Sequence, residues 1–120
     1  MPKLWRISDR ATFGALRRHG RRLRRGPLAL TWLPADPGTR PRVAFAVGRR
    51  VGGAVVRNRL RRQLRSAVQT LDPPLGPGAY LVSAAPEAAD LDYDSLRTVL
   101  MSLVAEAHPA PRATPRESNR

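Results

Sequence analysis

Hydrophobic residues alternate with small or polar residues in several short stretches of the chain, and this two-residue period is typical of strands. The clearest stretches are residues 28–33 and 42–47, which are separated by a turn segment rich in Pro, Gly and Asp. A further strand is expected at residues 79–84. The arginine-rich run at residues 21–26 leads into the first stretch, so we expect two or three strands before the period changes.

The predicted strand at residues 42–47 has two different faces. Val43, Phe45 and Val47 point one way and predict the buried side, whereas Ala44 and Ala46 point the other way. Because alanine side chains are small, the face of Ala44 and Ala46 leaves room for a ligand.

A short helix is expected at residues 11–18, before the strands. Ser8 or Asp9 can cap its start, and Gly20 stands where a residue in the left-handed conformation would end it. Phe13 lies on its apolar face.

Two longer helices are expected where the period lengthens to 3.6 residues, at residues 54–71 and 93–107. Asp92 or Asp94 can cap the second of these helices. In the first, the apolar positions fall on one arc of about 120° and predict the core side. They are Val56, Leu60, Leu64, Ala67, Val68 and Leu71.

The element order α-β-β-β-α-β-α predicts an α+β fold, a sandwich of two layers. A chain of 120 residues has the length of one domain with one modest core. We assign that domain to residues 1–108 and expect a disordered tail, rich in Pro and Arg, at residues 109–120.

The net charge of the chain is +13, from 22 basic and 9 acidic residues, and it points to a polyanionic partner. Nucleic acid is the default, because cationic side chains release the counterions condensed on a phosphate backbone. A membrane is the rival partner, but the sequence has no apolar run of the roughly 18 residues that a bilayer requires. The N-terminal segment also lacks the apolar stretch of a secretory signal, so we expect a cytoplasmic protein with no membrane partner.

The charge is divided sharply along the chain. Residues 10–71 contain sixteen arginines and one acid, Asp36, whereas residues 72–111 contain six acids and one arginine, Arg97. An asymmetry of this size favours a binding surface on the basic part over an evenly solvated surface.

Catalysis by the protein itself is not expected. The chain has no cysteine and only two histidines, His19 and His108, which predicts no metal held by the protein alone. Asp90, Asp92 and Asp94 alternate just before a helix, where capping and dipole complementarity explain them. The basic part, residues 10–71, has only one acid, so it lacks the cluster of carboxylates with which a protein phosphodiesterase holds Mg²⁺.

The stretch RRVGGAVVRNRLRRQLR at residues 49–65 carries the chemistry expected of a phosphate-binding surface. Gly52 and Gly53 stand just before the helix, where exposed N–H groups and the helix dipole suit a phosphate. Asn58 can donate to or accept from bases, ribose or phosphate. Arg59 points away from the others. The residues on the arc beside the core side are Arg57, Asn58, Arg61, Arg62 and Arg65. The plainer alternatives are a solvated cationic helix face and, for the two glycines, a simple turn.

This stretch resembles the signature of the bacterial ribonuclease P protein family. The resemblance extends to an N-terminal Phe13, the pair His19 and Gly20, and the strand and loop at residues 80–86. The signature positions are matched by Arg49, Arg50, Val51, Gly52, Ala54, Val55, Arg57, Asn58, Arg59, Leu60, Arg61 and Arg62.

The resemblance implies a left-handed β-α-β crossover around the long helix, similar to a domain found in ribosomal proteins. It also implies a function: the protein would join a catalytic RNA, one copy per RNA, and promote endonucleolytic removal of the 5′ leader of precursor tRNA. Mg²⁺ would be held mainly by the RNA subunit. The implied contacts with the RNA subunit are Arg49, Arg50, Gly52, Gly53, Arg57, Asn58, Arg59, Arg61, Arg62 and Arg65, and those with the leader are Phe13, Arg17, Ala44 and Ala46.

The chain departs from the family pattern at three places. Arg17 stands where many members have a second aromatic residue, Gly53 replaces the usual Asn, and Ala85 with Pro86 stands where many members have an Arg. The changes at Arg17, Ala85 and Pro86 indicate that leader recognition depends on charge more than on stacking, and Gly53 leaves no side chain for a contact at its position.

Two other functions fit the charge. One is a ribosome-associated or general RNA-binding protein without a processing role, against which the signature weighs. The other is a DNA-binding helix, but a helix that buries a wide apolar flank is poorly placed to enter a major groove, so we expect no DNA partner.

Overall fold

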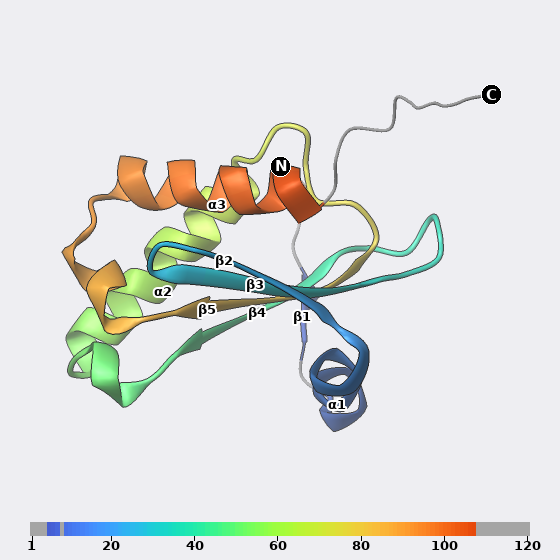
Figure 1. The fold of residues 1–120 in the computed structure, drawn as a ribbon, viewed down its shortest axis with the longest axis horizontal. Coiled ribbons are helices and arrows are strands. Elements are labelled where there is room, and N and C mark those ends of the chain that lie inside the picture. The colour runs from blue at the N-terminus through green and yellow to red at the C-terminus, as the bar shows by residue number, and fades with distance from the viewer. Residues whose placement is uncertain (1–4, 8, 108–120) are drawn as a thin grey trace.

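The computed structural model describes residues 5–7 and 9–107. Within this part the chain forms strands, helices and two short 3₁₀ turns, which Figure 1 shows in chain order. They are β1 (Trp5–Arg6), α1 (Arg10–His19), β2 (Arg21–Arg25), β3 (Leu28–Pro34), β4 (Arg42–Val47), η1 (Arg49–Val51), α2 (Ala54–Gln69), β5 (Gly78–Ala84), η2 (Pro86–Asp90) and α3 (Tyr93–Ala107). The tail predicted at residues 109–120 lies outside the described residues.

The predicted α+β order is confirmed, and the structure adds one strand before it. β1 pairs in parallel with β4, where Trp5 lies opposite Arg42 and Arg6 opposite Val43. Two residues are too few to display an alternating pattern, so no sequence period could have indicated β1.

A single sheet with the strand order β1-β4-β5-β3-β2 forms the middle of the molecule. β4 and β5 are parallel neighbours joined through α2, which is the β-α-β unit that the resemblance implied. The β2–β3 and β3–β5 pairs are antiparallel. Figure 1 shows α2 and α3 on one face of this sheet and α1 on the other. We call these the α2/α3 face and the α1 face.

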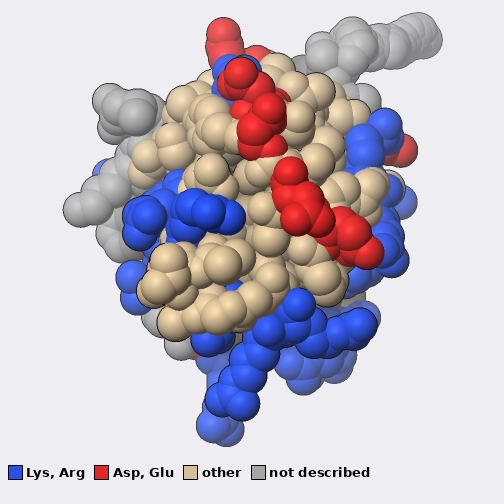
Figure 2. Space-filling view, turned by 90° about the vertical axis from the view of Figure 1, so that its left-hand side faces the viewer, with Lys and Arg blue, Asp and Glu red and all other residues tan. Residues whose placement is uncertain are grey.

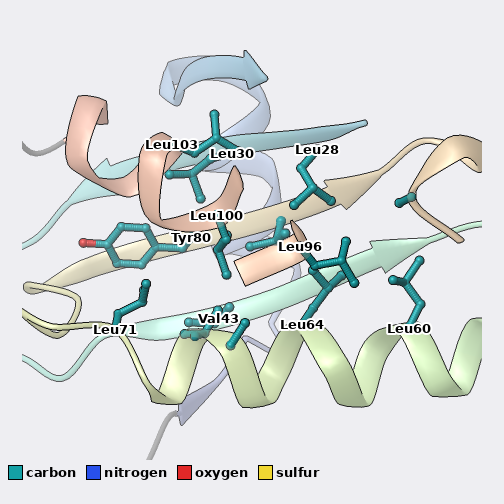
Figure 3. Close-up of a cluster of buried hydrophobic side chains, with 14 of the residues drawn as sticks. Leu28, Leu30, Val43, Leu60, Leu64, Leu71, Tyr80, Leu96, Leu100 and Leu103 are labelled. Atoms are coloured by element: carbon teal, nitrogen blue, oxygen red, sulfur yellow. The ribbon is translucent and has the colours of Figure 1, made fainter. Parts of the chain in front are cut away.

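The main core lies between the sheet and the α2/α3 face. Leu60 and Leu64 of α2 are fully buried against it, and Figure 3 shows both side chains directed from the helix toward the sheet. Tyr80 of β5 is also buried, and its hydroxyl donates to the Gly76 carbonyl over 2.9 Å. Burial raises the pKa of Tyr80 to about 12, because the phenolate would lose its hydration. The remaining buried members are Leu28, Leu30, Trp32, Val43, Val47, Ala67, Val68, Leu71, Val82, Ala88, Leu96, Leu100 and Leu103.

A second, smaller core lies on the α1 face. Its buried members are Ile7, Leu16 and Ala79, and the partly buried Phe13 and Ala44 pack against them. The predicted division of β4 into two faces is therefore confirmed, since Val43 and Val47 belong to the main core instead.

The first helix begins as predicted but ends differently. Asp9 caps it: its carboxylate accepts from the backbone N–H of Thr12 over 2.9 Å and from the Thr12 hydroxyl, and these bonds, with the charge of Arg42, lower the pKa of Asp9. The prediction for Gly20 was wrong, because its φ of −67° is extended backbone. Glycine is needed there for space, since a Cβ would lie 2.3 Å from the Leu16 carbonyl oxygen and 2.8 Å from Thr31 Cγ2.

The ends of the other helices follow the sequence closely. α2 starts at Ala54 as predicted and ends at Gln69, two residues earlier than expected, while Leu71 still reaches the main core. α3 spans the predicted residues. Asp92 caps it by accepting from the Ser95 N–H over 2.8 Å, and this bond lowers the pKa of Asp92.

Candidate nucleic-acid interface

The start of α2 differs from ordinary helix starts because no side chain caps it. Gly53 is its N-cap residue, and its first turn contains no acid. Gly52, just before it, has a φ of 156°, a conformation that side chains rarely adopt. A Cβ on Gly52 would also lie 3.1 Å from the Val56 side chain, whereas the space beside Gly53 is open. Glycine is therefore required at position 52 and not at position 53.

The backbone N–H groups of the first turn of α2 are left for an external acceptor. The Arg57 N–H is the first to find a helical partner, bonding to the Gly53 carbonyl over 2.9 Å. N–H groups before that point have no partner within a helix, and the helix dipole makes this end positive. Open space around Gly53 allows a phosphate oxygen to approach them.

The arginines of α2 divide into exposed side chains and side chains that pack against the domain. Arg62 and Arg65 of the predicted stripe are exposed, and so is Arg59, which the sequence placed apart from the stripe. Arg57 and Arg61 are only partly exposed, and the Nε of Arg57 is buried without a hydrogen-bond partner. Phosphate contacts are therefore expected mainly from the three exposed side chains.

Arg61 holds Asn58 in a defined orientation. Its guanidinium donates to the Asn58 Oδ1 over 3.0 Å and to the Val47 carbonyl of β4 over 3.3 Å. Because Arg61 occupies the amide oxygen, the amide nitrogen of the exposed Asn58 is left to donate outward. Sequence reasoning placed Arg61 among the RNA contacts, and the structure gives it this positioning contact as well.

The two arginines of η1 continue the basic surface beyond the start of α2. Arg49 and Arg50 are both exposed, and η1 packs against η2, which carries Glu87 and Asp90. Figure 2 shows the result on this end of the molecule: acidic side chains form a diagonal band, and basic side chains gather below it and on both sides. The acidic band would repel a polyanion on this end, and the basic side chains around the band would attract it.

The residues predicted to bind the leader lie on the opposite face of the sheet. Phe13 and Ala44 are partly buried on the α1 face, in contact with the small core there. Arg17, one turn after Phe13, is exposed, and so is Ala46 at the end of β4. The predicted site residues thus form two groups: one at η1 and α2, the other on the α1 face.

Sequence reasoning missed two kinds of residue. It left the arginines of β2 unassigned, although the RRLRR run at residues 21–25 is a visible signal. It also did not predict that Val55, in the first turn of α2, is exposed to solvent over 82% of its surface.

No group of three or more His, Cys, Asp or Glu residues that could hold a metal ion is found at residues 5–7 and 9–107. Among the same residues no helix is long and apolar enough to cross a membrane.

Known proteins resemble this chain over almost its full length. A family model described as Ribonuclease P matches residues 1–108. A ribonuclease P protein component of Symbiobacterium thermophilum is 38% identical over 108 residues, covering 89% of this chain and 94% of the relative. One of Thermobifida fusca is 42% identical over 105 residues, covering 81% of this chain and 71% of the relative.

Solved structures show the same fold. The ribonuclease P protein of Staphylococcus aureus aligns with a TM-score of 0.74 at 20% identity, covering 88% of this chain and 96% of that one. The protein of Thermotoga maritima aligns with a TM-score of 0.75 at 19% identity, covering 84% and 96%. Signature, fold and relatives agree, and the chain belongs to the ribonuclease P protein family.

Proposed function

We propose that this protein is the protein subunit of ribonuclease P and promotes endonucleolytic removal of the 5′ leader from precursor tRNA. One copy binds the RNA subunit through η1 and α2, and the α1 face binds the leader. The observation that carries the proposal is the match of the family model to residues 1–108. The geometry supports it, because the predicted contacts form two surfaces on opposite faces of one sheet.

The surface for the RNA subunit works by charge and by hydrogen bonds to phosphate. Guanidinium groups donate in a planar fork that fits phosphate oxygens, and the uncapped start of α2 adds backbone donors. The exposed Arg59, Arg62 and Arg65 extend this surface along the helix. These cations also screen the repulsion between the catalytic RNA and its substrate, which are both polyanions.

The chemical step belongs to the RNA subunit. Mg²⁺ requires oxygen ligands such as carboxylates, and the proposed interface consists of guanidinium groups, an amide and backbone N–H donors. These groups do not fit a Mg²⁺ ion, and arginine does not exchange protons near neutral pH. The protein therefore contributes affinity and positioning while the RNA holds the catalytic metal.

Cleavage of precursor tRNA by the reconstituted holoenzyme tests this function. The purified protein is added to its cognate catalytic RNA at low Mg²⁺, and release of the 5′ leader is followed over time. We expect faster cleavage at the mature 5′ end, because the protein lowers the requirement for screening by Mg²⁺. A short arginine-rich peptide of equal net charge is the control. Stimulation no greater than that of the peptide would contradict the proposal and favour general RNA binding.

The exposed arginines of α2 give a second test of the same function. Replacing Arg59, Arg62 and Arg65 together by Gln should weaken binding of the RNA subunit and lower the salt slope by up to about 2.7 if each contacts a duplex phosphate. The fold should survive, because these side chains lie outside both cores. Filter binding at several salt concentrations measures the slope, and an unchanged slope would exclude the stripe as the phosphate contact.

A further inference from the structure

β2 is an edge strand in which four arginines surround one leucine. The sheet order places it at the end beyond β3, and its residues Arg21, Arg22, Arg24 and Arg25 are all exposed. Successive side chains of a strand point to opposite faces of the sheet. These arginines therefore belong to two different surfaces.

Two contacts identify which arginines share which face. Leu23 packs against the main core, and the guanidinium of Arg25 is paired with Glu106 of α3. Arg21 and Arg25 consequently lie on the α2/α3 face with Leu23. Arg22 and Arg24 lie on the α1 face, the face that carries Phe13.

The strand register connects Arg24 to the exposed end of β4. Ala46 lies opposite Ser83, Ser83 opposite Ala29, and Ala29 opposite Arg24. With strands about 4.8 Å apart, this row crosses the sheet in about 14 Å. Its side chains between Ala46 and Arg24 are small, so no bulky group of the row separates the proposed leader surface from the arginines of β2.

Arg22 and Arg24 are available for an external anion. Within the described residues, no carboxylate or carbonyl accepts a hydrogen bond from either guanidinium, whereas Arg25 is paired with Glu106 and Arg42 with Asp9. A free, exposed guanidinium beside a surface for single-stranded RNA is suited to its phosphates, because the fork of donors matches phosphate oxygens.

We infer that Arg22 and Arg24 bind backbone phosphates of the single-stranded 5′ leader, continuing the leader surface from Ala46 and Phe13 across the sheet to its β2 edge. This inference rests on the proposed function. The two residues are separated by about 6.8 Å along the strand, a spacing comparable to that of successive phosphates on an extended nucleic acid strand. The contact reads no bases, so it strengthens binding of leaders of any sequence.

Charged edge strands have another common role, which is to prevent pairing with the edge of a second sheet. Arg21 and Arg25 serve that role as well as Arg22 and Arg24 do, because all four belong to the same strand. Only Arg22 and Arg24 share a face with the leader surface. The chain thus supplies a control with the same strand and the same change of charge.

The test compares two double variants in the reconstituted holoenzyme: Arg22→Gln with Arg24→Gln, and the control Arg21→Gln with Arg25→Gln. Dissociation constants are measured for mature tRNA and for precursors whose leaders are lengthened one nucleotide at a time. For long leaders we expect the first variant to bind roughly five- to tenfold more weakly than wild type, as two exposed ion pairs allow. Its salt slope should fall by about 1.4, the value for two phosphates of a single strand.

The inference would be overturned by no loss in the Arg22 and Arg24 variant, by an equal loss in the control, or by an equal loss for mature tRNA. A loss that is independent of leader length contradicts it as well. Circular dichroism checks that both variants fold; if the double variant does not, the single variants Arg22→Gln and Arg24→Gln replace it, each with a smaller expected loss. The proposed function fails separately, if the wild-type holoenzyme shows no stimulated cleavage.

Discussion

The two faces of the sheet differ in how completely their side chains are buried. On the α2/α3 face, helices cover the strands with large side chains, and Leu60, Leu64 and Tyr80 are completely buried. On the α1 face one short helix covers a small core, and Phe13 and Ala44 remain partly exposed while Ala46 is exposed. One face supplies most of the apolar burial that stabilises the fold, and the other keeps sheet surface accessible for a ligand.

This difference explains how a chain of 120 residues has room for the two RNA surfaces that we propose. Helices cover the sheet on the α2/α3 face, and the RNA contacts proposed for this side lie at the start of α2 and on the outer side of that helix. The α1 face buries less apolar surface, and part of the sheet therefore stays exposed there. Mutations should therefore separate stability from leader binding according to the face that they change.

The largest effect is expected for Leu64→Ala. Leu64 is fully buried in the main core, so its loss removes apolar contact and leaves a cavity, at about 2–5 kcal/mol of the free energy of unfolding. Urea denaturation measures this change. Under conditions where the variant is folded, its preference for precursor over mature tRNA should equal that of wild type. A lost preference in the folded variant would break the separation of the two faces.

Phe13→Ala should give the reverse pattern. Phe13 is only partly buried, so the free energy of unfolding should fall by less than for Leu64→Ala. If a leader base stacks on the ring, binding of precursor tRNA weakens by about 1–3 kcal/mol, while binding of mature tRNA hardly changes. Equilibrium binding of the two RNAs to the holoenzyme measures the difference. An equal loss for both would make Phe13 a core residue alone.

The sequence predicted the two-faced pattern better than the contacts between elements. Alternation in β4 separated Val43 from Ala44 correctly, because a strand's period directly reports which side is buried. Gly20 was misread, since glycine is needed there for space and not for a left-handed conformation, and part of that need comes from Thr31 of β3. Only the folded chain shows that contact.

For the candidate site too, the sequence predicted which residues take part but not the contacts between them. The arginines and glycines at residues 49–65 follow from the signature and from helical spacing. The hydrogen bonds of Arg61 to Asn58 and to Val47 do not, because Val47 approaches it only in the folded domain. Which arginines of β2 face the leader surface likewise depends on the register with β3 and on the contact of Arg25 with Glu106.

The smallest effect is expected for Gly53→Asp, which tests whether the N–H groups at the start of α2 contact the RNA subunit. Space beside Gly53 is open, and a carboxylate at the N-cap can accept from the first-turn N–H groups, so stability should rise by a few tenths of a kcal/mol. Binding of the RNA subunit should weaken, because the carboxylate occupies those donors and repels phosphate. Gly53→Asn is the uncharged control. Unchanged affinity in the Asp variant would remove the helix start from the RNA contact.

Site-specific crosslinking tests the central claim most directly, because the chain has no cysteine and a single one can be introduced at will. A photoreactive group is attached to Ala46→Cys on the α1 face or to Val55→Cys at the start of α2, both exposed positions. In the holoenzyme with precursor tRNA, we predict crosslinks from position 46 to the 5′ leader and from position 55 to the RNA subunit. Crosslinks from both positions to the same RNA segment, or the reverse assignment, would contradict the account.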